Sequence, residues 1–263
     1  MMMAAIENIL SSMGRWPREK ISDLGYASRS FISMVLSTVG LWRRPQLVVD
    51  QVHFIGNYSL MIIGVAGLFV GFVLGYLGFY TLNGYGAGES LGVLVALALV
   101  RELGPVMTAL LFAGRAGTSL TAEIGLMKAG EQLAAMEMMA INPRQRVIAP
   151  RFIAGVIALP ILSLVFNATG IIGGYLVGVE LIGVDSGAFW SQMQAKVSVM
   201  SDIGNGMIKS LVFGVAVSFV ALYQGYEAQP TPEGVARATT RTVVISSLLV
   251  LWLDFLLTAW MFQ

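Results

Sequence analysis

One run of residues, from Phe54 to Tyr80, contains no Asp, Glu, Lys or Arg and is apolar along almost its whole length. A helix needs roughly 20 apolar residues to cross the hydrocarbon core of a bilayer, and this run is longer than that. The composition agrees, because 56% of the chain is hydrophobic and 12% is charged, whereas soluble domains carry about 25% charged residues. We therefore expect an integral membrane protein. The run is too long and too rich in glycine for a barrel strand, which predicts transmembrane helices.

Four more apolar runs predict four more crossings. They extend from Leu91 to about Leu111 or beyond, from Phe152 to about Val179, from Met207 to Tyr226, and from Thr242 to Phe262. The fold class is therefore predicted to be all-α, with five transmembrane helices. An odd number of crossings argues against the two equal inverted halves found in many secondary transporters.

The first fifty residues differ from the rest. Their apolar run, Phe31 to Trp42, is too short to cross a membrane, and basic residues surround it. We expect an amphipathic helix in the membrane interface, with its arginines toward anionic headgroups. A soluble helix packed on the bundle is the alternative. The chain thus divides into a cytoplasmic N-terminal segment, residues 1–50, and a transmembrane domain, residues 51–263.

Basic residues predict the orientation of the crossings. Six precede the first crossing, five lie between Arg115 and Arg151, and two are Arg237 and Arg241, whereas the segments on the other side contain only Lys196. Loops rich in Lys and Arg stay in the cytoplasm. The N-terminus is therefore expected inside and the C-terminus outside.

Glycines recur every four residues in two of the crossings. They are Gly67, Gly71 and Gly75 in the first, and Gly170, Gly174 and Gly178 in the third. Residues at this spacing line one face of a helix, where small side chains let another helix approach closely. The pattern in the first crossing predicts close contact with a partner helix or with a second copy of the protein.

Four charged residues fall inside the predicted crossings. Arg101 and Glu102 are consecutive in the second crossing, where they point about 100° apart. A charge at the centre of a bilayer costs roughly 3 kcal/mol without a partner or water. These two either form an ion-pair network that fixes helix packing or line a polar patch in a transport pathway. Lys209 is expected to snorkel to the outer interface or to meet a lipid phosphate. Asp254 is expected to pair within the bundle rather than to relay protons.

Several classes of function lack the residues that they need. The chain has no Cys and a single histidine, His53, so it lacks the ligands for a zinc hydrolase and the parts of a Ser-His site. The stretch GNGMIKS lacks the glycine that precedes the lysine of a phosphate-binding loop. We therefore expect no enzyme activity and no cofactor bound by this chain. The net charge of +1 gives no reason to expect a nucleic acid partner.

The loop between Lys128 and Arg144 predicts a short amphipathic helix. Leu133, Met136 and Ala140 have helical spacing, and Asn142 and Pro143 are expected to end the helix. Methionines suit a protein contact that can repack. We expect this helix to dock into a separate ATPase subunit; a helix that rests on the membrane surface is the alternative. The predicted contact residues are Glu131, Gln132, Leu133, Met136, Glu137, Met139 and Ala140.

Two stretches carry a resemblance to a known family. The run from Arg101 to Arg151, RELGPVMTALLFAGRAGTSLTAEIGLMKAGEQLAAMEMMAINPRQRVIAPR, and the later GYEAQPTPEGVARATTRTVV closely resemble the MlaE/YrbE family of ABC transporter permeases. The resemblance implies a homodimeric phospholipid transporter in the inner membrane of Gram-negative bacteria that maintains outer-membrane lipid asymmetry. It also implies a cytoplasmic ATPase (MlaF-like) that binds ATP and Mg, a STAS-domain subunit (MlaB-like), a hexameric MCE-domain ring (MlaD-like) and a periplasmic lipid carrier (MlaC-like).

Residues and resemblance together predict where lipid would bind. The first, second and fifth crossings of two copies would wall an outward-facing cavity, lined by Leu74, Leu77, Tyr85 and Leu99, with polar contacts from Arg101, Glu102 and Lys209. Two other functions stay open. A proton-coupled secondary transporter would use Glu102 and Asp254 as a relay, and a non-transporting membrane anchor would only hold the MCE-domain ring.

Overall fold

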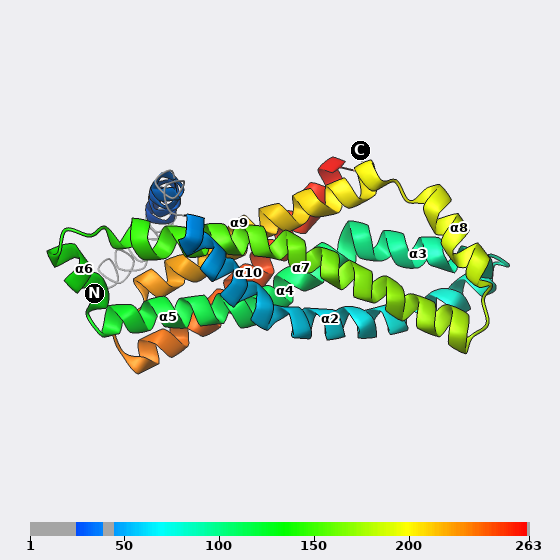
Figure 1. The fold of residues 1–263 in the computed structure, drawn as a ribbon, viewed down its shortest axis with the longest axis horizontal. Helices are drawn as coiled ribbons and strands as arrows, with labels where there is room; N and C mark the ends of the chain where they lie inside the picture. Colours follow the sequence, from blue (N-terminus) through cyan, green and yellow to red (C-terminus); the bar gives the residue numbers. More distant parts are fainter. Residues whose placement is uncertain (1–24, 39–44, 262–263) are drawn as a thin grey trace, which may run out of the picture.

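The computed structural model describes residues 25–38 and 45–261, and it confirms the all-α class and the five crossings (Figure 1). Five helical stretches are long and apolar enough to cross a membrane: Pro45–Asn83, Gly88–Ala129, Arg144–Leu181, Val199–Glu227 and Pro232–Met261. Each is longer than the apolar run that predicted it, because the helix continues through polar residues beyond the run. The first crossing is a single helix, α2 (Pro45–Asn83).

The second crossing is one continuous helical stretch of 42 residues. A short 3₁₀ turn, η2 (Gly88–Ser90), leads into α3 (Leu91–Ala98), η3 (Leu99–Leu103), α4 (Gly104–Phe112), η4 (Ala113–Gly117) and α5 (Thr118–Ala129), and both η3 and η4 are π-helical. Its apolar run stops near Leu111 because Arg115 follows. Arg115 does not end the helix, since its guanidinium donates to the Ile55 carbonyl and to Ser59 Oγ of α2.

The remaining crossings and loops complete the bundle. The third crossing joins η5 (Arg144–Ile148), α7 (Ala149–Tyr175) and η6 (Leu176–Leu181); the fourth joins η7 (Val199–Ile203) and α9 (Gly204–Glu227); the fifth is α10 (Pro232–Met261). Two short helices, α6 (Gln132–Met138) and α8 (Ser186–Lys196), lie in loops. The sequence TPEG starts α10 in the ordinary way, because Thr231 Oγ1 accepts from the Gly234 N–H and Pro232 is the first helical residue.

The two glycine patterns face each other inside one subunit. A Cβ at Gly67 would meet the Phe166 carbonyl oxygen 2.6 Å away, and one at Gly75 would meet the Gly174 carbonyl oxygen at 2.9 Å. A Cβ at Gly71 would collide with the Gly170 carbonyl oxygen. The partner of the first crossing at these glycines is therefore the third crossing, α7, and not a second copy of the protein.

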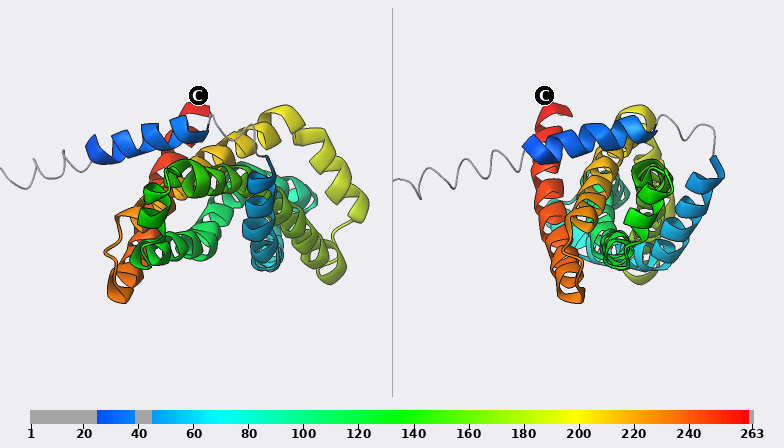
Figure 2. Two further views of the ribbon diagram at one scale, coloured as in Figure 1. Left: turned by 60° about the vertical axis from the view of Figure 1, so that its left-hand side comes forward. Right: turned by 90° about the vertical axis from the view of Figure 1, so that its left-hand side faces the viewer.

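Helix 25–38 lies across the bundle rather than along it (Figures 1 and 2). The ring of Phe31 packs edge-on against Phe219 of α9, with centroids 5.1 Å apart, and against Phe152 of α7. The helix begins before the predicted Phe31, and residues 39–42 of the prediction lie outside the described residues, as do Arg15, Arg18, Lys20, Arg43 and Arg44. Its 14 described residues are fewer than the roughly 20 that a helix needs to cross the hydrocarbon core, and its aromatic side chains fasten it to the bundle.

The helices begin and end at different positions along the long axis of the molecule. In Figure 1, α6 lies at one end of the long axis and α8 at the other, and α3 and α7 extend toward the α8 end. By contrast, α9 begins and α10 ends near the middle of that axis. The α8 end therefore contains fewer crossings than the α6 end.

Candidate functional site

Lys209 of α9 is the centre of a charge network inside the bundle. Its side chain is fully buried. Its Nζ donates to Glu102 Oε2 at 2.7 Å, to Asp254 Oδ1 at 3.0 Å and to Thr258 Oγ1 at 2.7 Å. An ammonium group has three hydrogens to donate, and all three find an acceptor here.

Two other crossings supply the partners of Lys209. Glu102 belongs to η3 of the second crossing, and Asp254 and Thr258, one helical turn apart, belong to α10. Thr258 Oγ1 also lies 3.3 Å from Glu102 Oε2, so the two partners contact each other. The Glu102 side chain is 38% exposed and that of Asp254 is 20% exposed, which places the carboxylates at the edge of the network and Lys209 inside it.

A second ion pair joins η3 to the start of the fourth crossing. Arg101 Nη2 lies 2.6 Å from Asp202 Oδ1, and Arg101 Nε donates to the same oxygen at 2.8 Å. Asp202 is almost completely buried, and its other oxygen accepts from the Ser198 N–H at 2.7 Å. Asp202 was missed from the sequence because it lies in a polar interval between two apolar runs, where an acid is ordinary.

The π-helical segment η3 explains how two adjacent charges reach two different partners. Arg101 and Glu102 point in different directions, one toward η7 and the other toward α9 and α10. The approach is tight here, since a Cβ at Gly206 would collide with the Val100 carbonyl oxygen. Single π-helical turns inside long helices recur at functional sites, and here the turn brings three crossings together.

One expectation for these charges needs correction. Lys209 does not snorkel to the outer interface, because its Nζ is enclosed by Glu102, Asp254 and Thr258. Lys209 lies five residues from the start of α9, and Thr258 lies three residues from the end of α10. Asp254 pairs within the bundle, as expected.

The predicted apolar lining residues do not share one environment. The side chains of Leu77 and Tyr85 are open, at 58% and 85% exposure. Leu74 is half-buried against the core. Leu99 is fully buried and packs on Gly170 of α7, so it faces the interior of the subunit rather than an open surface.

The loop helix α6 is shorter than predicted and is turned differently. It runs from Gln132 to Met138, and the residues on either side, Glu131 and Ala140, have positive φ angles of 57° and 59°. A non-glycine residue pays for that conformation with backbone strain. The expected ends at Asn142 and Pro143 are wrong, because the left-handed turn at Ala140 comes first.

The outward face of this loop also differs from the prediction. Leu133 is buried and Met136 is half-buried against the bundle, so these two predicted contact residues point inward. Glu131, Gln132, Glu137, Met139 and Ala140 are exposed. Met138 at 84% and Ile141 at 42% exposure were not predicted, and with Met139 at 64% they form an open apolar patch, here called the loop patch. The MEMM sequence carried this signal, but spacing alone did not show which methionines face outward.

Polar contacts fasten both ends of this loop to the bundle. Lys128 Nζ donates to the Tyr226 carbonyl at 2.6 Å. On the other side, Arg144 Nη1 donates to Ser33 Oγ at 2.7 Å, and Arg151 near the start of α7 forms a two-bond ion pair with Glu123 of α5, the shorter contact being 2.8 Å. The loop patch is therefore held at a fixed place at the end of the long axis.

Comparison with known proteins identifies the family. The family model described as Permease MlaE matches residues 48–260. The intermembrane phospholipid transport system permease protein MlaE of Haemophilus influenzae is 55% identical over 257 residues, which is 98% of both chains. Probable ABC transporter permease proteins of Rickettsia typhi and Synechocystis are 36% and 31% identical, covering 97% and 96% of this chain and 98% and 94% of their own. The chain belongs to the MlaE permease family.

Proposed function

We propose that this chain is the permease subunit of an ABC transporter that moves phospholipid between the bacterial inner membrane and a periplasmic carrier. The observation that carries the proposal is 55% identity, over 98% of both chains, to a permease named for intermembrane phospholipid transport. Transport of this kind would maintain the lipid asymmetry of the outer membrane. ATP and Mg would bind to a partner ATPase, and this chain would perform no hydrolysis.

The distribution of basic residues supports an orientation of the chain in the membrane. Lys128, Arg144, Arg146 and Arg151 all lie near the α6 end, where loops rich in basic residues remain in the cytoplasm. The α8 end and the C-terminus would then face the periplasm, with the N-terminus inside. The α8 end, where fewer crossings continue, would open toward the MCE-domain ring and the lipid carrier.

The loop patch is the proposed contact with the ATPase. Three exposed apolar side chains, Met138, Met139 and Ile141, project from a loop whose ends are anchored by ion pairs and hydrogen bonds. An anchored apolar patch beside the acidic Glu131 and Glu137 suits a groove in a protein better than bulk water. The STAS-domain subunit would join the complex through the ATPase.

Two copies of the chain would form the lipid cavity. Only 22% of the most apolar window of α2 and 17% of that of α10 is buried within one subunit, against 61% for the fourth crossing. The first and fifth crossings therefore have the most apolar surface left for lipid or a second copy. Leu77 of α2 and Tyr85, just after the end of α2, are exposed, whereas Leu99 is buried in the core.

The charge network supplies polar groups to that cavity. Arg101 and Glu102 keep 35% and 38% of their side chains exposed while their partners Asp202 and Lys209 are buried. The exposed parts of the Arg101 and Glu102 side chains would contact a lipid headgroup. Their ion pairs with Asp202 and Lys209 would hold η3 against the fourth crossing.

Two alternatives make different predictions. A proton-coupled transporter built on Glu102 and Asp254 would move lipid with the permease alone in a pH gradient. A membrane anchor for the MCE-domain ring would bind its partners without moving lipid. Liposomes that contain the whole complex and a labelled phospholipid separate these functions: we expect transfer to the carrier that depends on ATP. Transfer without ATP, or assembly without transfer, would reject the proposal.

A further inference from the structure

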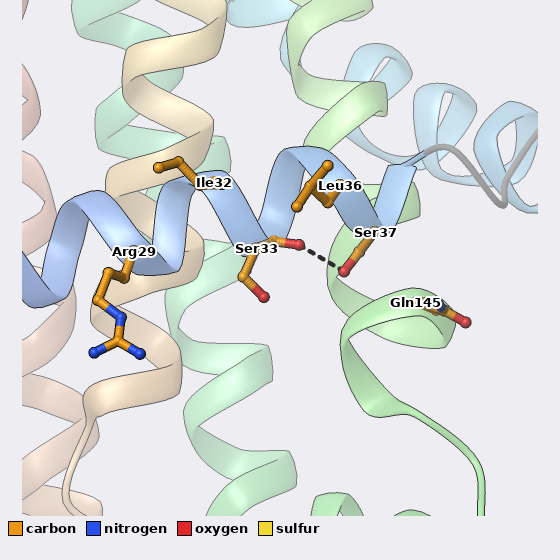
Figure 3. Close-up of a pocket in the computed structure, with 6 residues that line it drawn as sticks. All are labelled: Arg29, Ile32, Ser33, Leu36, Ser37 and Gln145. Atoms are coloured by element: carbon orange, nitrogen blue, oxygen red, sulfur yellow. Dashed lines mark hydrogen bonds between the residues drawn. The ribbon is translucent and has the colours of Figure 1, made fainter.

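A pocket of about 380 Å³ lies between helix 25–38 and the segment η5, away from the charge network (Figure 3). Its lining residues are Arg29, Ile32, Ser33, Leu36, Ser37 and Gln145. All but Gln145 belong to helix 25–38. The pocket therefore lies on the seam where this helix meets the start of the third crossing.

The helix side of the pocket has a polar row beside an apolar row. Arg29, Ser33 and Ser37 follow one another at intervals of four residues, and so do Ile32 and Leu36. Residues four apart are neighbours on a helix surface. In Figure 3, Ile32 and Leu36 project to one side of the helix, and Arg29 and Ser33 to the other. Ile32 is 58% and Leu36 67% exposed, although both are apolar.

Two residues of the polar row, Arg29 and Ser33, have donors that no described residue accepts, whereas Ser37 Oγ donates to the Ser33 carbonyl at 2.7 Å. Arg29 makes no hydrogen bond or ion pair with the part of the chain that the structure describes. The Ser33 hydroxyl accepts from Arg144 Nη1 at 2.7 Å and retains its own hydrogen for donation. Arg144 thus brings a second guanidinium to the edge of the pocket. No carboxylate lines the pocket, and guanidinium groups suit phosphate oxygens.

We propose that this pocket binds one anionic phospholipid of the cytoplasmic leaflet, separate from the transported lipid. Its phosphate would contact Arg29 and Ser33 beside Arg144, and an acyl chain would lie along Ile32 and Leu36. The proposal rests on the orientation given under the proposed function, which places helix 25–38 in the cytoplasmic interface. A free phosphate would leave the exposed apolar row uncovered, which is why we assign the pocket to a lipid.

The bound lipid would join three parts of the chain. Arg144 contacts Ser33 of helix 25–38, and its guanidinium lies 5.5 Å from the ring centre of Tyr226 at the end of α9. Arg144 is also where the chain returns from the loop patch to the membrane. A lipid phosphate at this point would hold helix 25–38, η5 and α9 together at the level of the headgroups.

The test is the count of lipids retained by the intact complex. The complex is purified from bilayers that contain phosphatidylglycerol and phosphatidylethanolamine, and native mass spectrometry counts each lipid. We expect preferential retention of phosphatidylglycerol. Arg29→Gln should lower that retention about fivefold, since a basic residue at an anionic surface contributes roughly 1 kcal/mol. Leu36→Asn should also lower it, and Arg29→Lys should restore most of it.

Matched controls define the outcomes that would overturn the proposal. Arg241→Gln removes an exposed arginine near the start of α10, outside this pocket, and should leave the count unchanged. An unchanged count in Arg29→Gln, or equal retention of phosphatidylethanolamine, would reject an anionic lipid site. Displacement of phosphatidylglycerol by excess inorganic phosphate would assign the pocket to a free anion and also reject it.

The same samples separate this proposal from the proposed function. Lipid counts need no ATP, and ATP-driven transfer is measured in parallel. Retention that depends on Arg29 in a complex that transfers no lipid would overturn the proposed function alone. Transfer by a complex whose retained lipid does not depend on Arg29 would overturn the pocket alone.

Discussion

Gly71 of α2 and Gly170 of α7 are in backbone contact, so that a Cβ on Gly71 would overlap the Gly170 carbonyl oxygen. The two helices meet along three successive turns in this way, at Gly67, Gly71 and Gly75. Without a hydrophobic driving force between helices in lipid, such close packing is what holds membrane helices together. The contact is therefore a sensitive point of the fold.

Gly71→Ala is expected to lower the stability of the purified permease by roughly 1–3 kcal/mol, because the added methyl group must push the two backbones apart. Gly56→Ala is the matched control, since it lies in the same helix and a Cβ there would meet no atom within 4 Å. The measurement is the midpoint of thermal unfolding in detergent. Equal midpoints for the two variants would contradict this packing.

Lys209→Met should destabilise the protein by roughly 3–5 kcal/mol, because it leaves the carboxylates of Glu102 and Asp254 without their shared cation. Neutralising both acids as well, in a Lys209→Met, Glu102→Gln, Asp254→Asn variant, should recover part of that loss. Lys196→Met, on the exposed end of α8, is the control for removing a lysine. Urea or thermal unfolding of the four proteins gives the comparison. A triple variant less stable than the single one would show that the acids do not depend on Lys209.

Leu77→Asn should reduce the phospholipid that co-purifies with the complex and the rate of ATP-driven transfer, because this exposed side chain is a proposed part of the cavity wall. Leu181→Asn is the control, since Leu181 is also exposed, at 73%, but belongs to η6 of the third crossing. Both variants should insert and fold normally. The same loss in both would point to a general effect of polarity rather than a cavity at Leu77.

The double variant Met138→Asp, Met139→Asp should release the ATPase subunit while the permease stays in the membrane. Two carboxylates placed in an apolar contact would have to be desolvated without partners, which costs several kcal/mol. Co-purification of the ATPase with a tagged permease measures the effect. Met200→Asp, at a methionine that is 89% exposed in η7, provides the control. Full recovery of the ATPase with the double variant would reject the loop patch as its contact.

The crossings could be predicted from the sequence because the bilayer demands a long apolar run from each helix on its own. The same holds for the start of α10, where Thr231 and Pro232 act within one turn. Pairing between crossings could not be predicted in this way. Asp202 is about a hundred positions from Arg101, and nothing in the local sequence of either indicates the other.

Local sequence patterns also did not determine which face of a helix points toward the rest of the bundle. Helical spacing correctly placed Leu133 and Met136 on one face of the helix, but it did not predict whether that face meets the bundle or the solvent. In the structure both side chains point inward. The glycine face of α2 likewise indicated a close neighbour without identifying α7. The orientation of a face depends on what the rest of the chain presents to it, which is a property of tertiary packing.

The second crossing is also long enough to connect the two ends of the bundle. Its 42 residues extend about 63 Å at the α-helical rise, with the loop of α6 attached at one end and α8 packed on the other through the Ser90–Gln192 hydrogen bond, 2.9 Å long. A helix resists compression along its axis, so a displacement of the α6 end is transmitted to α8 unless the crossing bends at η3 or η4. Sharp bends in long helices occur at π-bulges, so η3 and η4 are where we expect this crossing to bend if it is pushed from its cytoplasmic end, and η3 carries Arg101 and Glu102.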